Sequence, residues 1–139
     1  MNLPTVGSVY TPVTLTVNLH DPLRKARLMF RHNHIKQLPV MHKGKLMGLV
    51  KEKDVWLLLG PDFDYPRESD LSVEDAYISD PLIVDIGDSL VNTLMLMAEQ
   101  RSGCVLVTDK GELAGIFTDT DACRYFGKYL KGAYLASSI

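Results

Sequence analysis

Several features that would assign a function directly are scarce or missing in this chain. Its 139 residues contain 2 cysteines, Cys104 and Cys123, which form neither a disulfide framework nor a C-x-x-C motif. No apolar run exceeds five residues, far short of the roughly 20 that span a membrane. The first residues lack the basic and then apolar layout of a secretory signal. We therefore expect a protein of the reduced cytoplasm that does not cross a membrane.

Catalytic and metal-binding motifs are also missing. There is no Walker loop, no G-x-S-x-G and no H-E-x-x-H, so the sequence does not indicate an enzyme. His32 and His34 do not share a helix face, and no acid or cysteine completes a zinc site, so we expect solvated histidines at these positions and at His20 and His42. The net charge of −2 argues against a general nucleic-acid binder. The basic cluster of residues 24–36 fits the solvent-exposed face of an amphipathic helix.

What the chain does contain is a duplication. Shifted by 67 residues, the span from Leu15 to Trp56 matches a second span without a gap, so elements and loops have equal lengths in both copies. The matched positions keep turn glycines, apolar residues and one acid in register: Leu15/Leu82, Val17/Val84, Asp21/Asp88, Leu23/Leu90, Val40/Val107, Lys43/Lys110, Gly44/Gly111, Leu46/Leu113, Gly48/Gly115 and Asp54/Asp121. Two copies of so small a unit are expected to share a core and to form a binding cleft where they meet.

Each copy is predicted to run strand, helix, strand, turn, strand, helix. In the first copy, β-branched residues at 13–19 predict a strand, and Asp21 with Pro22 predicts a capped helix start. Strands at 37–41 and 46–50 and a helix at 52–59 follow. The second copy repeats this order with strands at 82–86, 104–107 and 113–117 and with helices that begin near residues 88 and 119.

Each copy also carries a short signature. The first reads Leu38-Pro39-Val40-Met41, then Gly44-x-Leu46-x-Gly48 and Asp54; the second reads Val105-Leu106-Val107, then Gly111-x-Leu113-x-Gly115 and Thr118-x-x-Asp121. Over residues 5–127 the chain resembles a stand-alone tandem pair of cystathionine-β-synthase (CBS) domains, a Bateman module. The resemblance implies an α/β (α+β) fold of two βαββα units, packed sheet to sheet with pseudo-twofold symmetry. It divides the chain into domains at 5–60 and 72–128, a linker at 61–71 and a tail at 129–139.

Thr118, Thr120 and Asp121 form the first candidate ligand site. They lie where a strand is predicted to turn into a helix, and the unpaired N–H groups of a helix start suit a phosphate. The threonines add hydroxyls, and the two oxygens of Asp121 can accept from both hydroxyls of a ribose. The resemblance implies that residues near Ser8, Val13, Ile35 and Lys36 complete this cleft. The alternative, that the same residues only cap the helix, stays open.

The resemblance implies a second, weaker cleft. Its residues are Lys51, Lys53, Asp54, Asp75, Asp80, Ser102 and Gly103. Lys51 stands where the family has Ser or Thr, and the acids Asp75 and Asp80 bring negative charge towards any phosphate. We therefore expect the first cleft to be the better ligand site.

Together these observations predict a non-enzymatic regulatory module without a cofactor of its own. It is expected to sense an adenine nucleotide (AMP, ADP, ATP or a related adenosyl ligand) in the cleft between its copies and to signal to an unidentified protein, a form of energy sensing. The resemblance also implies a homodimer, with Trp56, Tyr125 and Phe126 as contact residues. The alternative function is a degenerate pair that binds no nucleotide and serves as a dimerisation or docking scaffold.

Overall fold

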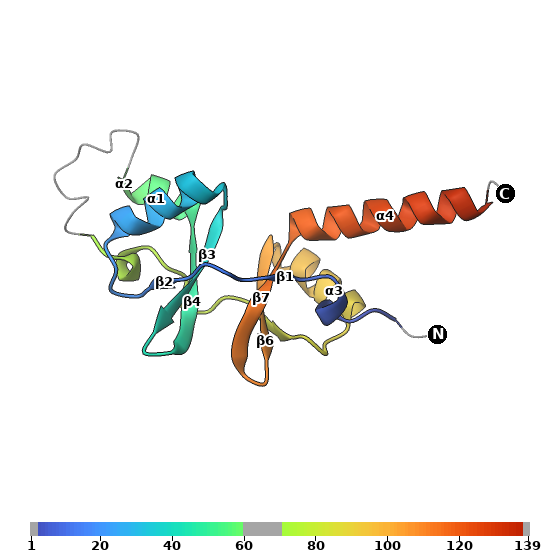
Figure 1. Cartoon of the computed structure of the whole chain (residues 1–139), viewed down its shortest axis with the longest axis horizontal. Helices are drawn as coiled ribbons and strands as arrows, with labels where there is room; N and C mark the ends of the chain where they lie inside the picture. Colours follow the sequence, from blue (N-terminus) through green and yellow to red (C-terminus); the bar gives the residue numbers. More distant parts are fainter. Residues whose placement is uncertain (1–2, 60–70, 138–139) are drawn as a thin grey trace. The chain divides into compact units, whose positions relative to one another are not determined.

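A computed structural model describes residues 3–59 and 71–137, with side chains through residue 132 (Figure 1). The chain forms two compact units. The discontinuous unit combines residues 1–13 with residues 82–139, and the central unit holds residues 14–81. These units differ from the sequence-based boundaries of 5–60 and 72–128, because the residues that precede each repeat pack with the other repeat.

The central unit is built on a three-stranded sheet of order β2-β3-β4. β2 (Val17–Asn18) lies parallel to β3 (Gln37–His42), and β3 pairs antiparallel with β4 (Lys45–Lys51). The connections are helical, with α1 (Leu23–Asn33) between β2 and β3 and α2 (Glu52–Leu59) after β4. The apolar stripe of α1 packs over the strands and closes the core. The buried residues of this core are Val17, Leu19, Leu23, Ala26, Phe30, Leu38, Val40, Val50, Val55 and Val73.

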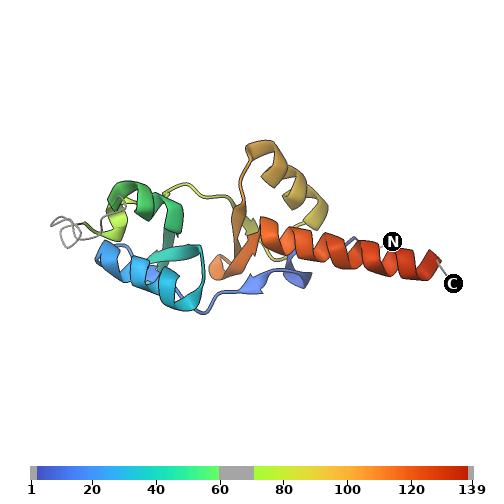
Figure 2. The ribbon, with the colours of Figure 1, turned by 90° about the horizontal axis from the view of Figure 1, so that it is seen from above.

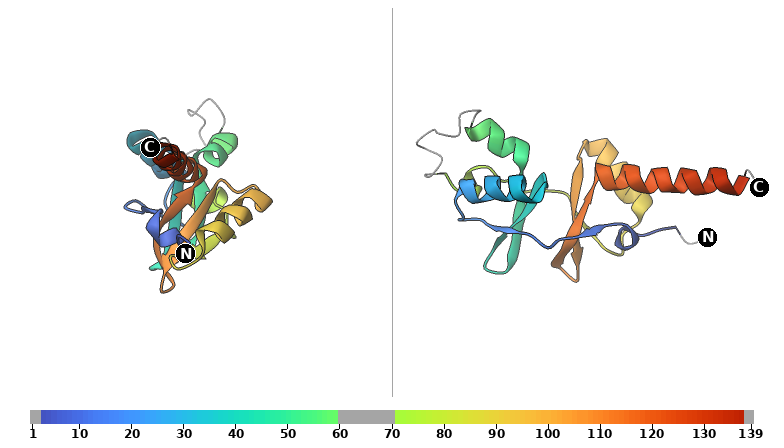
Figure 3. Two further views of the ribbon diagram at one scale, coloured as in Figure 1. Left: turned by 90° about the vertical axis from the view of Figure 1, so that its right-hand side faces the viewer. Right: turned by 45° about the horizontal axis from the view of Figure 1, so that its top comes forward.

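The discontinuous unit repeats this plan with one additional strand. Its sheet has the order β1-β7-β6-β5, formed by β1 (Thr11–Pro12), β5 (Ile83–Asp85), β6 (Cys104–Asp109) and β7 (Glu112–Thr118). α3 (Leu90–Gln100) connects β5 to β6, and α4 (Asp119–Ser137) follows β7. The C-terminal half of α4 extends beyond the sheet of its own unit (Figures 2 and 3). The core consists of Val6, Val84, Leu90, Met97, Val105, Val107 and Phe117.

The predicted duplication and the mixed α+β class are confirmed by the backbone. α1 and α3, β3 and β6, and β4 and β7 have the same lengths at equivalent positions. Even irregular residues recur: His34 and Arg101, which follow the first helix of each copy, both have φ of 53°, and the turn glycines Gly44 and Gly111 have φ of +77° and +82°. Positive φ is the conformation that glycine adopts without a steric cost, which explains both turns.

Each repeat is preceded by a short segment that docks on the other repeat. We call these the first lead-in (residues 5–13) and the second lead-in (residues 72–80). The first lead-in contains η1 (Val6–Ser8) and then pairs with β7, Thr11 opposite Ile116. The second contains η3 (Val73–Asp75) and bridges to β4, Ile78 opposite Leu49. Val6 and Val73, both fully buried, anchor the two segments.

Three local predictions need correction or completion. The predicted continuous strand at 13–19 is wrong, because within it only Val17–Asn18 (β2) forms a strand, and residues 13–16 connect β1 to β2. Asp21 does not cap α1: its Oδ2 accepts from the Asn18 N–H at 2.9 Å, and Pro22 occupies the N-cap. The tail continues α4 as far as Ser137. The predicted linker at 61–71 lies, except for Leu71, outside the described residues.

Candidate functional site

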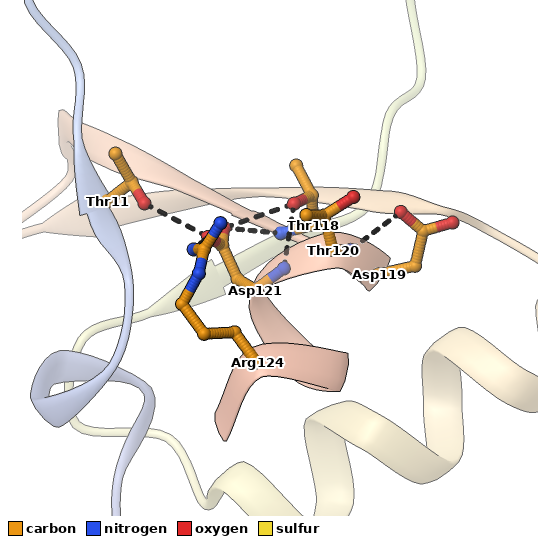
Figure 4. Close-up of polar contacts among 6 residues, drawn as sticks. All are labelled: Thr11, Thr118, Asp119, Thr120, Asp121 and Arg124. Atoms are coloured by element: carbon orange, nitrogen blue, oxygen red, sulfur yellow. Dashed lines mark hydrogen bonds and ion pairs between the residues drawn. The ribbon is translucent and has the colours of Figure 1, made fainter. Parts of the chain in front are cut away.

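The junction of β7 and α4 is built by two side chains that bind each other's backbone (Figure 4). The Thr118 hydroxyl accepts from the Asp121 N–H at 3.2 Å, and Asp121 Oδ2 accepts from the Thr118 N–H at 3.0 Å and from its hydroxyl at 3.1 Å. This reciprocal arrangement is a capping box, which satisfies amide groups that the first turn of a helix leaves unpaired. The capping role considered from the sequence is therefore present, and it fixes the direction of the Asp121 carboxylate.

The other oxygen of Asp121, Oδ1, contacts one residue that is distant in the sequence and one that is close. Oδ1 accepts from the Thr11 hydroxyl and from Arg124 Nη1, both at 3.2 Å. Thr11 reaches this position because the first lead-in pairs with β7, whereas Arg124 lies one turn along α4. The Asp121 side chain is 12% exposed and the Arg124 side chain 59% exposed, so the carboxylate is mostly covered and the guanidinium is largely solvated.

An open pocket of about 300 Å³ adjoins this carboxylate. It is lined by Ser8, Val9, Thr11, Asp121, Arg124, Tyr125 and Lys128. Residues 121, 124, 125 and 128 share one face of α4 because neighbours on a helix face are three or four positions apart. The pocket thus combines one carboxylate, two cations, two aliphatic hydroxyls and an aromatic ring. This set of groups can bind a ligand that carries hydroxyl donors at one end and an anion at the other.

The residues predicted for the first cleft fall into both units. Ser8 lines the pocket, and Thr118, Thr120 and Asp121 occupy the start of α4. Val13 fixes the first lead-in, because its N–H donates to the Ala114 carbonyl at 3.2 Å. Ile35 and Lys36 belong to the central unit, where Ile35 packs against the core and the Lys36 carbonyl accepts from the Glu52 N–H.

The residues predicted for the second cleft are divided in the same way. Lys51 ends β4, Lys53 and Asp54 lie in the first turn of α2, and Asp75 and Asp80 follow in the second lead-in, all within the central unit. Ser102 and Gly103 belong to the discontinuous unit. There the Ser102 hydroxyl donates to the Cys104 carbonyl at 2.7 Å, and the Gly103 carbonyl accepts from the Asp119 N–H at 2.9 Å.

Comparison of the two helix starts explains why they differ. The residue equivalent to Thr118 is Lys51, whose side chain offers no acceptor for a cap. The residues equivalent to Thr11 and Arg124 are Ile78 and Leu57, which offer no side-chain donor. Within residues 3–59 and 71–132, the Asp54 carboxylate makes no side-chain hydrogen bond or ion pair. The polar pocket is therefore a property of the second repeat and the first lead-in.

Thr11, Arg124 and Lys128 were missed as site residues in the sequence. A signal for Thr11 exists upstream of the recognised duplication, because Val6 and Tyr10 recur as Val73 and Tyr77 at the same spacing. That recurrence indicates that the lead-in is part of the repeat, although it does not reveal where the lead-in docks. Arg124 and Lys128 lie three and seven positions after Asp121, which places all three on one helix face.

Neither a metal site nor a membrane-spanning helix is found among the described residues. No group of three or more His, Cys, Asp or Glu residues in this part of the chain is arranged to hold a metal ion. His20 Nδ1 lies 3.3 Å from Glu74 Oε2. The His20 ring also contacts the His42 ring, with ring centroids 4.8 Å apart. Among the described helices, none is both long and apolar enough to cross a membrane.

Both repeats match the same protein-family model. The CBS domain model matches residues 6–55 and 73–128. Protein MJ1225 of Methanocaldococcus jannaschii is 30% identical over 110 residues, and an inosine-5'-monophosphate dehydrogenase of Korarchaeum cryptofilum is 29% identical over 108 residues. These matches cover 73% and 77% of this chain but 39% and 21% of the two relatives. The chain therefore spans well under half the length of either curated relative.

Solved structures share the fold at lower sequence identity. CBSX2 of Arabidopsis thaliana superposes with a TM-score of 0.81 at 23% identity, covering 94% of this chain and 99% of that one. CBSX2 has also been solved in complex with AMP, with a TM-score of 0.77 and coverage of 91% and 98%. The structure of MJ1225, described as a proposed archaeal homologue of γ-AMPK, has a TM-score of 0.75 at 22% identity and covers 88% of this chain and 48% of that one. This chain belongs to the CBS domain family, with one domain in each repeat.

Proposed function

We propose that this CBS pair is a regulatory module that binds an adenine nucleotide at the pocket of the discontinuous unit and signals to a partner protein. In this proposal the Asp121 carboxylate accepts from the ribose hydroxyls. Thr118 and Thr120 lie at the start of α4, where the helix dipole favours an anion. Arg124 and Lys128 add two cations to the lining of the pocket. The carrying observation is that Thr11, Asp121 and Arg124 converge on one open pocket from segments 110 residues apart in the sequence.

Two properties of relatives support this proposal. CBSX2 forms a complex with AMP, and MJ1225 is described as a proposed homologue of the γ subunit of AMPK. The contrast between the repeats also favours one site over two. The hydroxyls of Thr11 and Thr118 and the cation of Arg124 have the counterparts Ile78, Lys51 and Leu57 in the central unit, where only the carboxylate is kept, as Asp54. We therefore expect one nucleotide for each chain.

Calorimetric titration with AMP, ADP and ATP tests the proposal. A ligand at one hundred times its dissociation constant stabilises the folded chain by about 2.7 kcal/mol, so a thermal melt should rise by several degrees. Asp121→Asn should abolish the binding heat, whereas the matched variant Asp54→Asn in the first repeat should retain it. Because Asp121→Asn also weakens the helix cap, by about 1 kcal/mol, each variant is titrated below its own melting transition. Loss of binding in both variants, or no heat with any nucleotide at millimolar concentration, would contradict the assignment.

A second function, a dimerisation or docking scaffold, is favoured by apolar side chains that the chain leaves in solvent. Trp56 and Leu57 on α2 are 48% and 82% exposed, and Phe126 and Tyr129 on α4 are 58% and 62% exposed. Clustered exposed apolar residues usually mark a surface that another protein covers. Sedimentation velocity with and without AMP distinguishes the two functions. A dimer that forms without any nucleotide binding, and that Leu57→Glu or Phe126→Glu dissociates, would support the scaffold.

A further inference from the structure

All acceptor positions of the Asp121 carboxylate are in use in this structure. Oδ2 receives two bonds from Thr118, and Oδ1 receives one each from Thr11 and Arg124 (Figure 4). A carboxylate has about four lone-pair sites, so two ribose hydroxyls cannot simply be added to this network. A ligand that binds through Asp121 must therefore take the place of donors that the protein now supplies.

The two oxygens differ in how easily their donors are released. The bonds of Oδ2 form the capping box, and loss of a cap typically costs about 1 kcal/mol of stability. Oδ1 is held by the hydroxyl of an exposed threonine and by a guanidinium that is 59% exposed. Arg124 regains water when it leaves Oδ1, so breaking this half-solvated ion pair is expected to cost little. Oδ1 is consequently the oxygen that opens to a ligand.

Release of Arg124 changes the charge of the pocket. In this structure the positive charge of the Arg124 guanidinium is offset by the Asp121 carboxylate. Once Arg124 is released, its charge is no longer offset and lies with that of Lys128 in the lining of the same pocket. A phosphorylated ribonucleoside compensates both for the donors lost from Oδ1 and for the ion pair lost by Arg124. Its diol donates to Oδ1, and its phosphate pairs with the guanidinium. An unphosphorylated nucleoside supplies only the diol and leaves Arg124 without its former partner.

We propose that Arg124 exchanges partners, from the Asp121 carboxylate to a ligand phosphate, and thereby makes the pocket selective for phosphorylated ribonucleosides. This inference rests on the proposed nucleotide site and adds the residue that sets its specificity. The first repeat supports it as an internal contrast. There Leu57 occupies the position equivalent to Arg124, and the Asp54 carboxylate lacks a side-chain partner among the described residues. Among the residues that the structure describes, exchange of this kind is available only in the second repeat.

Titration of adenosine and AMP into wild type and Arg124→Gln tests the exchange. In wild type AMP should bind about tenfold or more tightly than adenosine, since a charge-assisted contact to phosphate is strong. In Arg124→Gln the affinity for AMP should fall about tenfold, while the affinity for adenosine should stay the same or rise up to about twofold, because no ion pair competes for Oδ1. The preference for AMP should therefore largely disappear.

Two further variants separate this role from general effects of charge and folding. Lys131→Gln removes the same charge from an exposed residue of α4 that does not line the pocket, and it should preserve the AMP preference. Arg124→Lys keeps the charge and should restore most of the preference. Thermal melts of each variant confirm that the titrated protein is folded.

The outcomes distinguish the two levels of the proposal. If wild type binds AMP and Arg124→Gln keeps the same ratio of AMP to adenosine affinity, the exchange is wrong while the nucleotide site stands. If adenosine affinity falls in parallel with AMP affinity, Arg124 supports the pocket structurally and the exchange is again refuted. If wild type binds neither compound at millimolar concentration, both the site and the exchange are refuted.

Discussion

Replacement of Gly115 by alanine tests how the first lead-in docks on the discontinuous unit. Gly115 lies on β7 opposite Pro12 of β1. A Cβ atom at this position would overlap the backbone oxygen of Thr11 and would lie 2.6 Å from Cε2 of Tyr10. The backbone oxygen cannot rotate away as a flexible side chain could, so the lead-in itself must move away from β7.

The expected loss of stability follows from these contacts. Inserting a methyl group into a tightly packed contact costs about 1–3 kcal/mol. Displacement of the lead-in also weakens the 3.2 Å bond from the Val13 N–H to the Ala114 carbonyl, which contributes about 1 kcal/mol. Gly115→Ala should therefore lower the free energy of unfolding by about 2–4 kcal/mol, or the melting temperature by roughly 5–15 °C. Urea denaturation followed by circular dichroism measures the first quantity, and a thermal melt measures the second.

Gly127→Ala is the matched control for this prediction. Gly127 lies inside α4, and a Cβ there meets nothing within 4 Å. Because alanine is the better helix former, this variant should be about 0.5–1 kcal/mol more stable than wild type. Tight docking of the lead-in on β7 is refuted if Gly115→Ala unfolds at the wild-type urea concentration, or if both variants are destabilised equally. In the former case the lead-in does not press against β7.

Three further predictions follow from local structure. Ser89→Ala should destabilise the chain by about 1 kcal/mol in urea titrations, because the Ser89 hydroxyl caps α3 by accepting from the Asn92 N–H at 3.2 Å; unchanged stability would exclude the cap. Phe117→Ala should cost about 3–5 kcal/mol because this side chain is fully buried, and a loss below 1 kcal/mol would contradict that burial. Thiol labelling of the native protein should modify exposed Cys123 rapidly and buried Cys104 only on unfolding; rapid labelling that survives Cys123→Ser would refute this assignment.

Much of the fold could be predicted because the same pattern of elements occurs twice in the sequence. The elements from α1 to the start of α2 recur in the same order and spacing from α3 to the start of α4. Apolar positions, turn glycines and helix starts in one copy therefore support the assignment in the other. The family and the mixed α+β class are confirmed on this basis. Thr118 and Asp121 could be selected for the same reason, since they stand at a strand-to-helix junction with a cap-forming spacing.

Other features were not accessible to local patterns. Gly48 and Gly115 are conspicuous in the sequence as a repeated pair, yet their reason is tertiary. A Cβ at either position would overlap the backbone oxygen of the lead-in residue that crosses there, Ile78 or Thr11. Sequence periodicity reports which face of a strand is apolar, but it carries no information about which distant segment covers that strand.

Local sequence patterns were enough to identify the duplication, the order of elements and the pair of residues that closes the start of α4, because these depend on neighbours a few positions apart. Tertiary packing places the first lead-in against the second repeat, which brings the Thr11 hydroxyl within 3.2 Å of Asp121 Oδ1 and gives the second repeat its polar pocket. Contacts between residues so distant in the chain depend on how whole elements pack. The sequence therefore identified the carboxylate, and the packing supplied its partners.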